Sequence, residues 1–172
     1  MKNGYNMLNG AIYPHEPESE KQLFIDILKE YSKDKNIVTG IEIGVLFGDT
    51  SKFLLSIDEK IHLIGIDPII PDSMAPELIG DVEKIKENTA EYGNRFIFIQ
   101  DYSYKVASQF NNIDFVFIDG SHFYEDCKQD YELYYPIIKE GGFIFFHDSR
   151  MYLGGATFHE GSSRVVGELI NI

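Results

Sequence analysis

The sequence has few cysteines and few basic residues, and it has no long apolar run. Its single cysteine, Cys127, cannot form an intrachain disulfide, which fits a reducing compartment. Lys and Arg number 15 against 28 Asp and Glu, so the formal net charge is -13 and bare nucleic acid or an anionic membrane would be repelled. No apolar stretch approaches the roughly eighteen residues that span a bilayer, and no signal peptide is evident. We therefore expect a cytoplasmic protein without nucleic-acid or membrane partners.

Apolar strands alternate with amphipathic helices along the chain. A length of 172 residues suits one domain, which we expect over 1–172 with 1–17 as a lead-in loop or flap. Periodicity predicts strands over 37–43, 61–66, 96–99, 113–118 and 143–146, and helices over 19–32, 50–57, 78–92, 104–110 and 123–138, with a short helix capped by Ser162 or Ser163. The fifth helix is expected to end near Gly141-Gly142. This alternation predicts an α/β fold with a doubly wound parallel sheet.

A glycine-containing turn follows the first predicted strand. Gly44 and Gly48 lie in the run from Ile41 to Thr50, and Asp67 ends the next strand. Glycine lets the backbone approach a ligand closely, and the acid can hold a ribose diol. The spacing therefore predicts a nucleoside site at the carboxyl edge of the sheet. It lacks the dinucleotide fingerprint G-x-G-x-x-G, so a nicotinamide-dependent dehydrogenase is the less favoured alternative.

Other predicted strands also carry or end in polar residues. Glu42 lies inside the first strand, where a carboxylate without a partner would be costly, so we expect a backbone amide or a ligand group beside it. Asp119 and His122 follow the fourth strand, and His147-Asp148 follow the fifth. Because parallel strands end at a common edge, Asp119, His147 and Asp148 are expected to offer oxygen and nitrogen donors to one divalent ion.

These segments resemble a class I S-adenosylmethionine-dependent methyltransferase. The likeness rests on the run 41–50, on Asp67, and on the pattern from Phe115 to Asp148 in which I-D-G-S-H is followed by G-G and an apolar strand ending in H-D. It covers about residues 18–170 and is strongest to small-molecule O-methyltransferases of macrolide-sugar and cephalosporin pathways, with catechol O-methyltransferases as more distant relatives. The resemblance implies a Rossmann-like methyltransferase fold. It also implies methyl transfer from S-adenosylmethionine to a hydroxyl of a small metabolite.

The same resemblance implies a set of cofactor-binding residues. In chain order these are Glu42, Gly44, Gly48, Thr50, Asp67, Asp101, Tyr102, Ser103 and Asp119. Glu42 and Thr50 would contact the amino and carboxylate ends of the cofactor. Asp67 would take the ribose hydroxyls, and the segment 101–103 would border the adenine.

Catalytic and metal-binding roles follow from the resemblance as well. Asp119 and His122 would be catalytic, with His122 as the general base, and Asp119, His147 and Asp148 would ligate a divalent metal. Several relatives end the fifth strand with two acids or Asp-Asn. His147 therefore leaves open whether the ion is Mg²⁺ or a softer one, and whether a metal is required at all.

The carboxyl-terminal part of the chain departs from the family pattern. The family fold normally adds two strands after the fifth, and the sequence stops at Ile172 before them. The strand 143–146 would then be an exposed apolar edge, so we expect either a fragment or a homo-oligomer that covers this edge. Aromatic residues that could wall the hydroxylated acceptor are Tyr5, Tyr13, Tyr152 and Phe158. A degenerate member that binds the cofactor without turnover is a further alternative.

Overall fold

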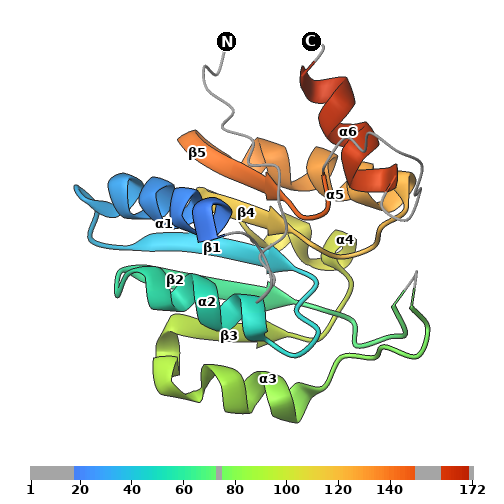
Figure 1. Ribbon diagram of the computed structural model, residues 1–172, viewed down its shortest axis with the longest axis horizontal. Coiled ribbons are helices and arrows are strands. Elements are labelled where there is room, and N and C mark those ends of the chain that lie inside the picture. Colours follow the sequence, from blue (N-terminus) through green and yellow to red (C-terminus); the bar gives the residue numbers. More distant parts are fainter. Residues whose placement is uncertain (1–17, 73–74, 150–159, 171–172) are drawn as a thin grey trace.

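The computed structural model describes residues 18–72, 75–149 and 160–170. Within these residues lies a sheet of five parallel strands in the order β3-β2-β1-β4-β5 (Figure 1). The strands are β1 (Val38–Ile43), β2 (Ile61–Ile66), β3 (Phe96–Ile99), β4 (Ile113–Ile118) and β5 (Ile138–Phe146). Helices and strands alternate as the sequence predicts, and the predicted α/β fold with a parallel sheet is confirmed.

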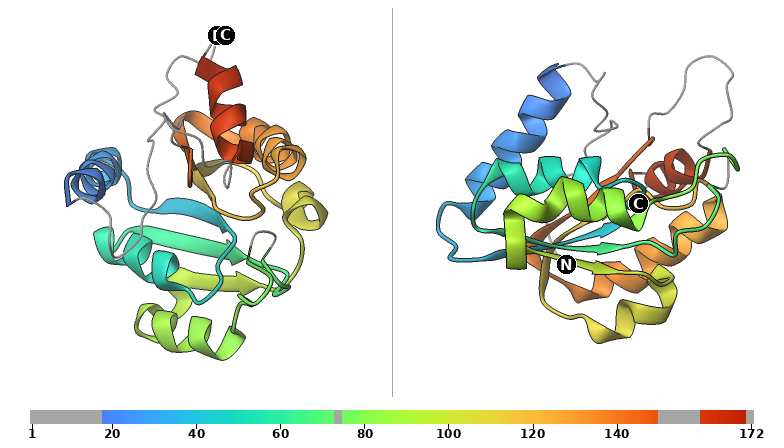
Figure 2. Two further views of the ribbon diagram at one scale, coloured as in Figure 1. Left: turned by 45° about the vertical axis from the view of Figure 1, so that its right-hand side comes forward. Right: turned by 90° about the horizontal axis from the view of Figure 1, so that it is seen from below.

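Helices cover both faces of the sheet. They are α1 (Glu18–Ser32), α2 (Asp49–Ile57), α3 (Val82–Thr89), α4 (Ser103–Val106), α5 (Tyr124–Tyr134) and α6 (Glu160–Ile170). Figure 2 shows α1 and α2 on one side and α4, α5 and α6 on the other, with α3 beside α2. In the part of the chain that the structure describes, no helix is long and apolar enough to cross a membrane.

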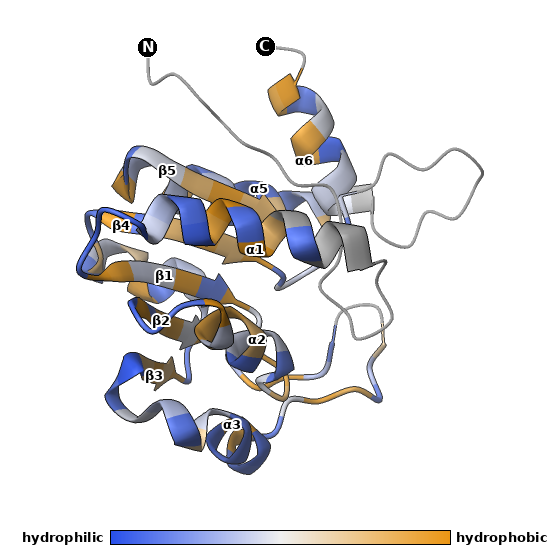
Figure 3. Ribbon diagram, turned by 60° about the vertical axis from the view of Figure 1, so that its left-hand side comes forward, coloured by the Kyte–Doolittle hydropathy of each residue, from blue (hydrophilic) through white to orange (hydrophobic). Residues whose placement is uncertain are grey.

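Strand β4 contributes side chains to the apolar cores on both faces of the sheet. All six of its residues are buried, and successive side chains point to opposite faces of the sheet. Phe115 and Phe117 pack with α1 and α2, whereas Val116 and Ile118 pack with α5 and α6. The nearly all-apolar run that predicted this strand, interrupted only by Asp114, is therefore explained by burial on both faces. Figure 3 shows the apolar colour concentrated on the strands, with hydrophilic segments on the helices around them.

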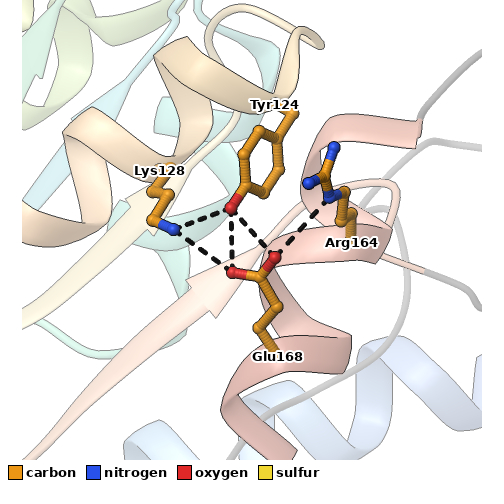
Figure 4. A network of polar contacts seen from close by, with 4 residues as sticks. All are labelled: Tyr124, Lys128, Arg164 and Glu168. Atoms are coloured by element: carbon orange, nitrogen blue, oxygen red, sulfur yellow. Dashed lines mark hydrogen bonds and ion pairs between the residues drawn. The ribbon is translucent and has the colours of Figure 1, made fainter.

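Helix α6 closes one face near β5. Val165 and Val166 are 2% and 1% exposed and belong to the same core as Ile144 and Phe146. At the surface, a polar network joins α5 to α6 (Figure 4). Its members are Tyr124, Lys128, Arg164 and Glu168, in which the Tyr124 hydroxyl donates to the Glu168 carboxylate at 2.9 Å and the Arg164 guanidinium lies over the Tyr124 ring.

The carboxyl edge of the sheet is held by backbone hydrogen bonds that continue beyond the strands. The residues that follow β1, β2, β4 and β5 each donate the backbone N–H to the last carbonyl of a neighbouring strand. The four bonds are Asp67 to Ile99 at 3.1 Å, Gly44 to Ile66 at 2.9 Å, Asp119 to Ile43 at 2.8 Å, and His147 to Ile118 at 2.9 Å. We call these bonds the edge ladder. They place the residues after β1, β2, β4 and β5 side by side.

Two predicted helix boundaries were wrong. The helix predicted over 78–92 begins at Val82, because the Asp81 carboxylate accepts from the N–H groups of Glu83 and Lys84 and caps it there. A short 3-10 segment, Ala90–Arg95, continues it.

The helix predicted over 123–138 also ends early, at Tyr134, and is followed by the 3-10 turn Tyr135–Ile137. Gly141-Gly142 do not cap a helix but lie inside β5, which begins at Ile138 instead of Phe143. The pairing register of β4 with β5 shifts at this point. A side chain at Gly142 would meet the Asp114 carbonyl at 2.4 Å, so glycine is required by a strand irregularity.

Candidate active site

The turn after β1 brings the glycine segment against the end of β4. Gly44 has φ +85, and a Cβ built on it would lie 2.1 Å from the Asp119 carbonyl oxygen. Leu46 also has a positive φ of 54, which is uncommon for a bulky residue and marks a strained turn. Gly48, with φ 82, is the N-cap of α2. Gly44 thus brings the turn against Asp119, whereas Gly48 approaches Ile85 and Asn88 of α3.

Asp67 holds this turn in place. Its Oδ2 accepts from the N–H groups of Val45 and Leu46 at 2.8 and 2.9 Å, and its Oδ1 accepts from Ile69 N–H at 2.7 Å. A carboxylate offers about four acceptor positions, so Oδ1 keeps capacity for a ligand hydroxyl. Asp67 therefore has a role in ordering the glycine turn that the sequence did not reveal.

Glu42 is fully buried beneath the same turn. Its Oε2 accepts from the Ser51 hydroxyl of α2, while Oε1 has no hydrogen-bond partner among the described residues. Burial raises the pKa of Glu42 well above its ordinary value; Asp119 and Asp67 add to the shift, and the Ser51 bond opposes it. A buried polar oxygen of this kind is expected to meet a ligand group. Together with the Gly44 turn, it fits a polar cofactor.

The segment after β3 lies beside α5. The Ser103 hydroxyl donates to Asp130 Oδ1 at 2.5 Å, and the Tyr134 hydroxyl donates to the Ser103 carbonyl at 2.9 Å. Asp101 accepts from Tyr102 N–H at 2.8 Å, and Tyr102 is 37% exposed. The Ser103 side chain thus engages α5, so its contribution to an adenine pocket would come from the backbone. The sequence did not single out Asp130, because nothing local links it to a loop 27 positions earlier.

Asp119, His147 and Asp148 form a compact cluster at the ends of β4 and β5. His147 Nδ1 lies 2.8 Å from Asp119 Oδ1 and 3.0 Å from Asp148 Oδ2. Burial alone would lower the pKa of His147, but the two carboxylates outweigh it and raise the pKa to about 10. Burial raises the pKa of Asp119, and the charge of His147 opposes that shift. The three residues predicted to meet therefore do meet, as an ion-paired group.

His122 lies near this cluster on the segment that leads into α5. Its carbonyl accepts from Gly161 N–H at 3.2 Å, which ties the start of α6 to this segment. The charge of His122 is close enough to lower the pKa of Asp119. Thr50 lies in the first turn of α2, next to the Gly48 N-cap. The proposed aromatic wall of Tyr5, Tyr13, Tyr152 and Phe158 lies outside the described residues, as does the lead-in segment 1–17.

The predicted metal ligands do not fit a metal ion in this arrangement. Asp119 Oδ1 and Asp148 Oδ2 lie 2.8 and 3.0 Å from His147 Nδ1. Across residues 18–72, 75–149 and 160–170, no group of three or more His, Cys, Asp or Glu residues is arranged to hold an ion.

Comparison with known proteins identifies the family. The chain is 30% identical over 145 residues to the uncharacterized protein R132 of Acanthamoeba polyphaga mimivirus. The alignment covers 79% of this chain and 62% of that protein. The chain thus spans less than two thirds of the length of this relative. Among solved structures, a Corynebacterium glutamicum protein aligns with a TM-score of 0.65 and 19% identity over 92% of this chain and 74% of that one.

The O-methyltransferase TomG from Streptomyces achromogenes, involved in tomaymycin synthesis and solved with S-adenosylmethionine, shares the fold. It aligns with a TM-score of 0.58 and 13% identity over 87% of this chain and 69% of that one. A family model described as a methyltransferase domain matches residues 41–149, which include the glycine turn, Asp67 and the Asp119–His147 cluster. The chain therefore belongs to this family of methyltransferase domains.

Proposed function

We propose that this methyltransferase uses S-adenosylmethionine to methylate a hydroxyl group of a small metabolite. The observation that carries the proposal is the edge ladder, which sets Gly44, Asp67, Asp119 and His147 side by side at one edge of the sheet. Ligands of open parallel sheets bind outside this edge. This arrangement supports the assignment of the donor-binding residues and Asp119 to one site.

Donor binding is assigned to the segments after β1, β2 and β3. When bound, S-adenosylmethionine supplies an electrophilic methyl group on a sulfonium centre. The Gly44 turn would pass beneath it, and Glu42 Oε1, which has no partner in the described part of the chain, would meet its polar end. Asp67 Oδ1 would accept from a ribose hydroxyl, and the backbone of 101–103 would border the adenine. Asp119, beside Gly44, would face both the donor and the acceptor.

His122 is assigned as the general base. An acceptor oxygen must lose its proton to attack a carbon, and imidazole, with an ordinary pKa near 6.5, can take a proton close to neutral pH. The acidic Asp119 neighbour would favour the charged imidazole once the proton has been taken. The base would thus remove the hydroxyl proton while the cluster at the end of β5 holds Asp119 in place.

A small, uncharged or cationic acceptor fits the protein better than a polyanion. The formal net charge is -13, which would repel a nucleic-acid backbone and an anionic membrane. The match to a methyltransferase family model argues against a nicotinamide-dependent dehydrogenase. The remaining alternative is a family member that binds the cofactor but does not transfer its methyl group. An assay of methyl transfer to hydroxylated compounds distinguishes it from an active enzyme.

Calorimetry with S-adenosylhomocysteine tests the donor site. We expect saturable binding by the wild-type chain and at least about tenfold weaker binding by Asp67→Ala, because this change removes an acceptor and loosens the glycine turn. Glu87→Gln, an exposed substitution on α3, is the matched control and should bind as the wild type does. Heat with NAD and none with S-adenosylhomocysteine would refute the proposal.

A further inference from the structure

The amino-terminal turn of α6 lies against the segment that carries His122. Gly161, the second residue of α6, donates its N–H to the His122 carbonyl oxygen at 3.2 Å. The first four N–H groups of an α-helix have no acceptor inside the helix, so each needs one from elsewhere. The residue assigned as the general base therefore supplies, through its main chain, an acceptor for the start of α6.

This approach requires a glycine. A Cβ built on Gly161 would lie 2.3 Å from the His122 carbonyl oxygen, 2.7 Å from the Phe123 carbonyl carbon and 2.8 Å from the Tyr124 backbone nitrogen. All three are main-chain atoms, which cannot move aside as the end of a flexible side chain can. An alanine at this position would have to push the two segments apart, from 2.3 Å to 3.4 Å or more at the closest pair of atoms.

The next two residues of α6 contact the elements on either side of His122. The Cys127 thiol of α5 donates to the Ser162 hydroxyl at 3.6 Å, and the Ser163 hydroxyl donates to the Asp148 carbonyl at 3.3 Å. Farther along the two helices, the surface network of Figure 4 joins α6 to the start of α5. The first turn of α6 is thus held against both α5 and the end of β5.

The segment of His122 lies between β4 and α5, outside regular secondary structure. Within it, the Ser121 hydroxyl accepts from Phe123 N–H at 3.3 Å and donates to Asp126 at 2.6 Å. These contacts join close neighbours in the sequence, so they shape the segment without fixing its place in the fold. The Gly161 bond instead ties the segment to a helix that follows β5, and so sets where His122 lies relative to the end of the sheet.

We propose that Gly161 is a positioning residue, whose contact with the main chain of His122 sets the distance between the general base and the acceptor hydroxyl. The inference rests on the proposed function, in which His122 takes the acceptor proton. A general base must lie within hydrogen-bond reach of that proton, and a misplacement of about 1 Å can reduce a rate by a factor of about 10². Donor binding is assigned to the segments after β1, β2 and β3, so this contact governs turnover and not donor affinity.

Gly161→Ala tests the inference, and Gly167→Ala on the same helix is the matched control. Nothing lies within 4 Å of the position that a Cβ on Gly167 would take. With labelled S-adenosylmethionine and a hydroxylated compound that the wild type methylates, Gly161→Ala should lower kcat by a factor of about 10 to 100, whereas its affinity for S-adenosylhomocysteine should stay within about twofold. Gly167→Ala should leave both values within about twofold of the wild type.

Combination with His122→Ala separates positioning from a general loss of structure. If Gly161 acts through His122, Gly161→Ala should cause less than about a twofold further loss of kcat in a chain that already carries His122→Ala. An equal loss in both backgrounds would overturn the inference. Undiminished kcat in a folded Gly161→Ala variant would overturn it as well.

Nuclear magnetic resonance measures the contact without turnover. In the wild type, the Gly161 amide should exchange with deuterium at least about tenfold more slowly than an unprotected amide. The imidazole resonances of His122, assigned by their loss in His122→Ala, should move in Gly161→Ala and stay in place in Gly167→Ala. A rapidly exchanging Gly161 amide would overturn the inference even if Gly161→Ala does not fold.

Failure of the proposed function gives a different pattern. Failure of the wild type to bind S-adenosylhomocysteine refutes the donor site and leaves the resonance test of the Gly161 contact in place. Full activity of His122→Ala removes the general base, and the positioning role is lost with it. Full activity of Gly161→Ala beside an impaired His122→Ala refutes the positioning role alone.

Discussion

Gly44 is required by its backbone conformation and by its close approach to a neighbouring backbone. Its φ is +85, and an added Cβ would lie 2.1 Å from the Asp119 carbonyl oxygen. Gly93 also has a positive φ, of 54, but nothing lies within 4 Å of the position that an added Cβ would take. A substitution of Gly93 by alanine therefore strains the backbone without creating a steric clash. The pair therefore separates backbone strain from close approach.

We predict that Gly44→Ala lowers the free energy of unfolding by about 3 kcal/mol, whereas Gly93→Ala lowers it by about 1 kcal/mol. Urea denaturation followed by circular dichroism measures both values. Gly44→Ala should also lose binding of S-adenosylhomocysteine, and Gly93→Ala should retain it. Equal losses of stability in the two variants would show that the approach of Gly44 to Asp119 is not tight.

His122 is the residue on which turnover depends in the proposed mechanism. His122→Ala should reduce the rate of methyl transfer by a factor of about 10² to 10⁴, because an aligned general base typically contributes that much. Its affinity for S-adenosylhomocysteine should stay within about twofold of the wild type, since donor binding is assigned to other residues. His62→Ala, on β2, is the matched control. The assay follows labelled methyl groups into a panel of hydroxylated compounds.

Undiminished turnover by His122→Ala would remove His122 from the mechanism. Absence of turnover by the wild type with every hydroxylated compound, despite binding of S-adenosylhomocysteine, would favour the degenerate alternative.

For individual residues, the sequence predicts which side chains lie at strand ends but not which side chains they contact. Asp119, His147 and Asp148 could be predicted to meet because each follows a buried strand and parallel strands end at one edge. The Ser51–Glu42 and Ser103–Asp130 contacts could not, because they depend on how each helix rotates against the sheet. The direction of His147 Nδ1 toward both acids likewise depends on side-chain rotamers that spacing does not fix.

The Ser103–Asp130 contact links α4 to α5 and has a predicted dependence on pH. Burial raises the pKa of Asp130 to about 6; Asp126 adds to the shift and the Ser103 bond opposes it. Because the pKa is raised on folding, the associated stabilisation is present below the ordinary pKa near 3.8 and is lost as pH rises through about 6.

We therefore predict that the free energy of unfolding of the wild type falls relative to that of Asp130→Asn by about 1 kcal/mol between about pH 5 and pH 7. Asn keeps an oxygen that can accept from Ser103 but does not ionise. Chemical denaturation at several pH values measures the difference. Parallel pH profiles for the two proteins would contradict the shift assigned to Asp130.

Attachment of α6 to the rest of the fold is expected to depend on its apolar side chains more than on its surface charges. Val166→Ala should lower the free energy of unfolding by about 1 to 3 kcal/mol, because it removes two methyl groups from a site that is 1% exposed. Glu168→Gln, in the network of Figure 4, should cost less than about 1 kcal/mol, because exposed ion pairs are weak. Denaturation of both variants gives the ranking, and the reverse order would contradict it.

Strands were predicted more accurately than helix ends. The bounds of β2, β3 and β4 agree with the prediction, because each is a short, largely apolar run with a polar residue directly before and after it. The end of α5 and the start of β5 were wrong for a physical reason. Two adjacent glycines after a helical pattern are typical of a helix terminus, and sequence alone does not separate that from a strand irregularity.

Considered as a whole, the sheet has β5 at one edge and β3 at the other within the described residues. The side chains of Phe143 to Phe146 are buried within the chain, so the expectation of an exposed apolar strand was wrong, and what remains is the backbone edge of β5. We propose that a second copy of the chain covers this backbone edge. Light scattering should then give twice the monomer mass. Two chains of net charge -13 repel each other, so added salt should strengthen the dimer. A monomer mass at every protein and salt concentration would exclude this arrangement.

The position of the site on the molecule could be predicted, whereas its acceptor could not. Alternating strands and helices define a parallel sheet, and such a sheet binds ligands beyond the carboxyl ends of its strands. In the proposed function, acceptor choice would be set by side chains that surround this edge. The aromatic residues predicted for that purpose lie outside the described residues, so their part stays a prediction.

The edge ladder has a consequence for how this scaffold could change over evolutionary time. Its four bonds join main-chain atoms only, so at Asp119 and His147 they impose no requirement on the side chain, whereas Gly44 and Asp67 are constrained by the turn that they form. Replacing an acid or an imidazole there would alter reactivity while leaving the underlying platform where it is. New specificities could thus arise by single substitutions, without a compensating rearrangement of the backbone.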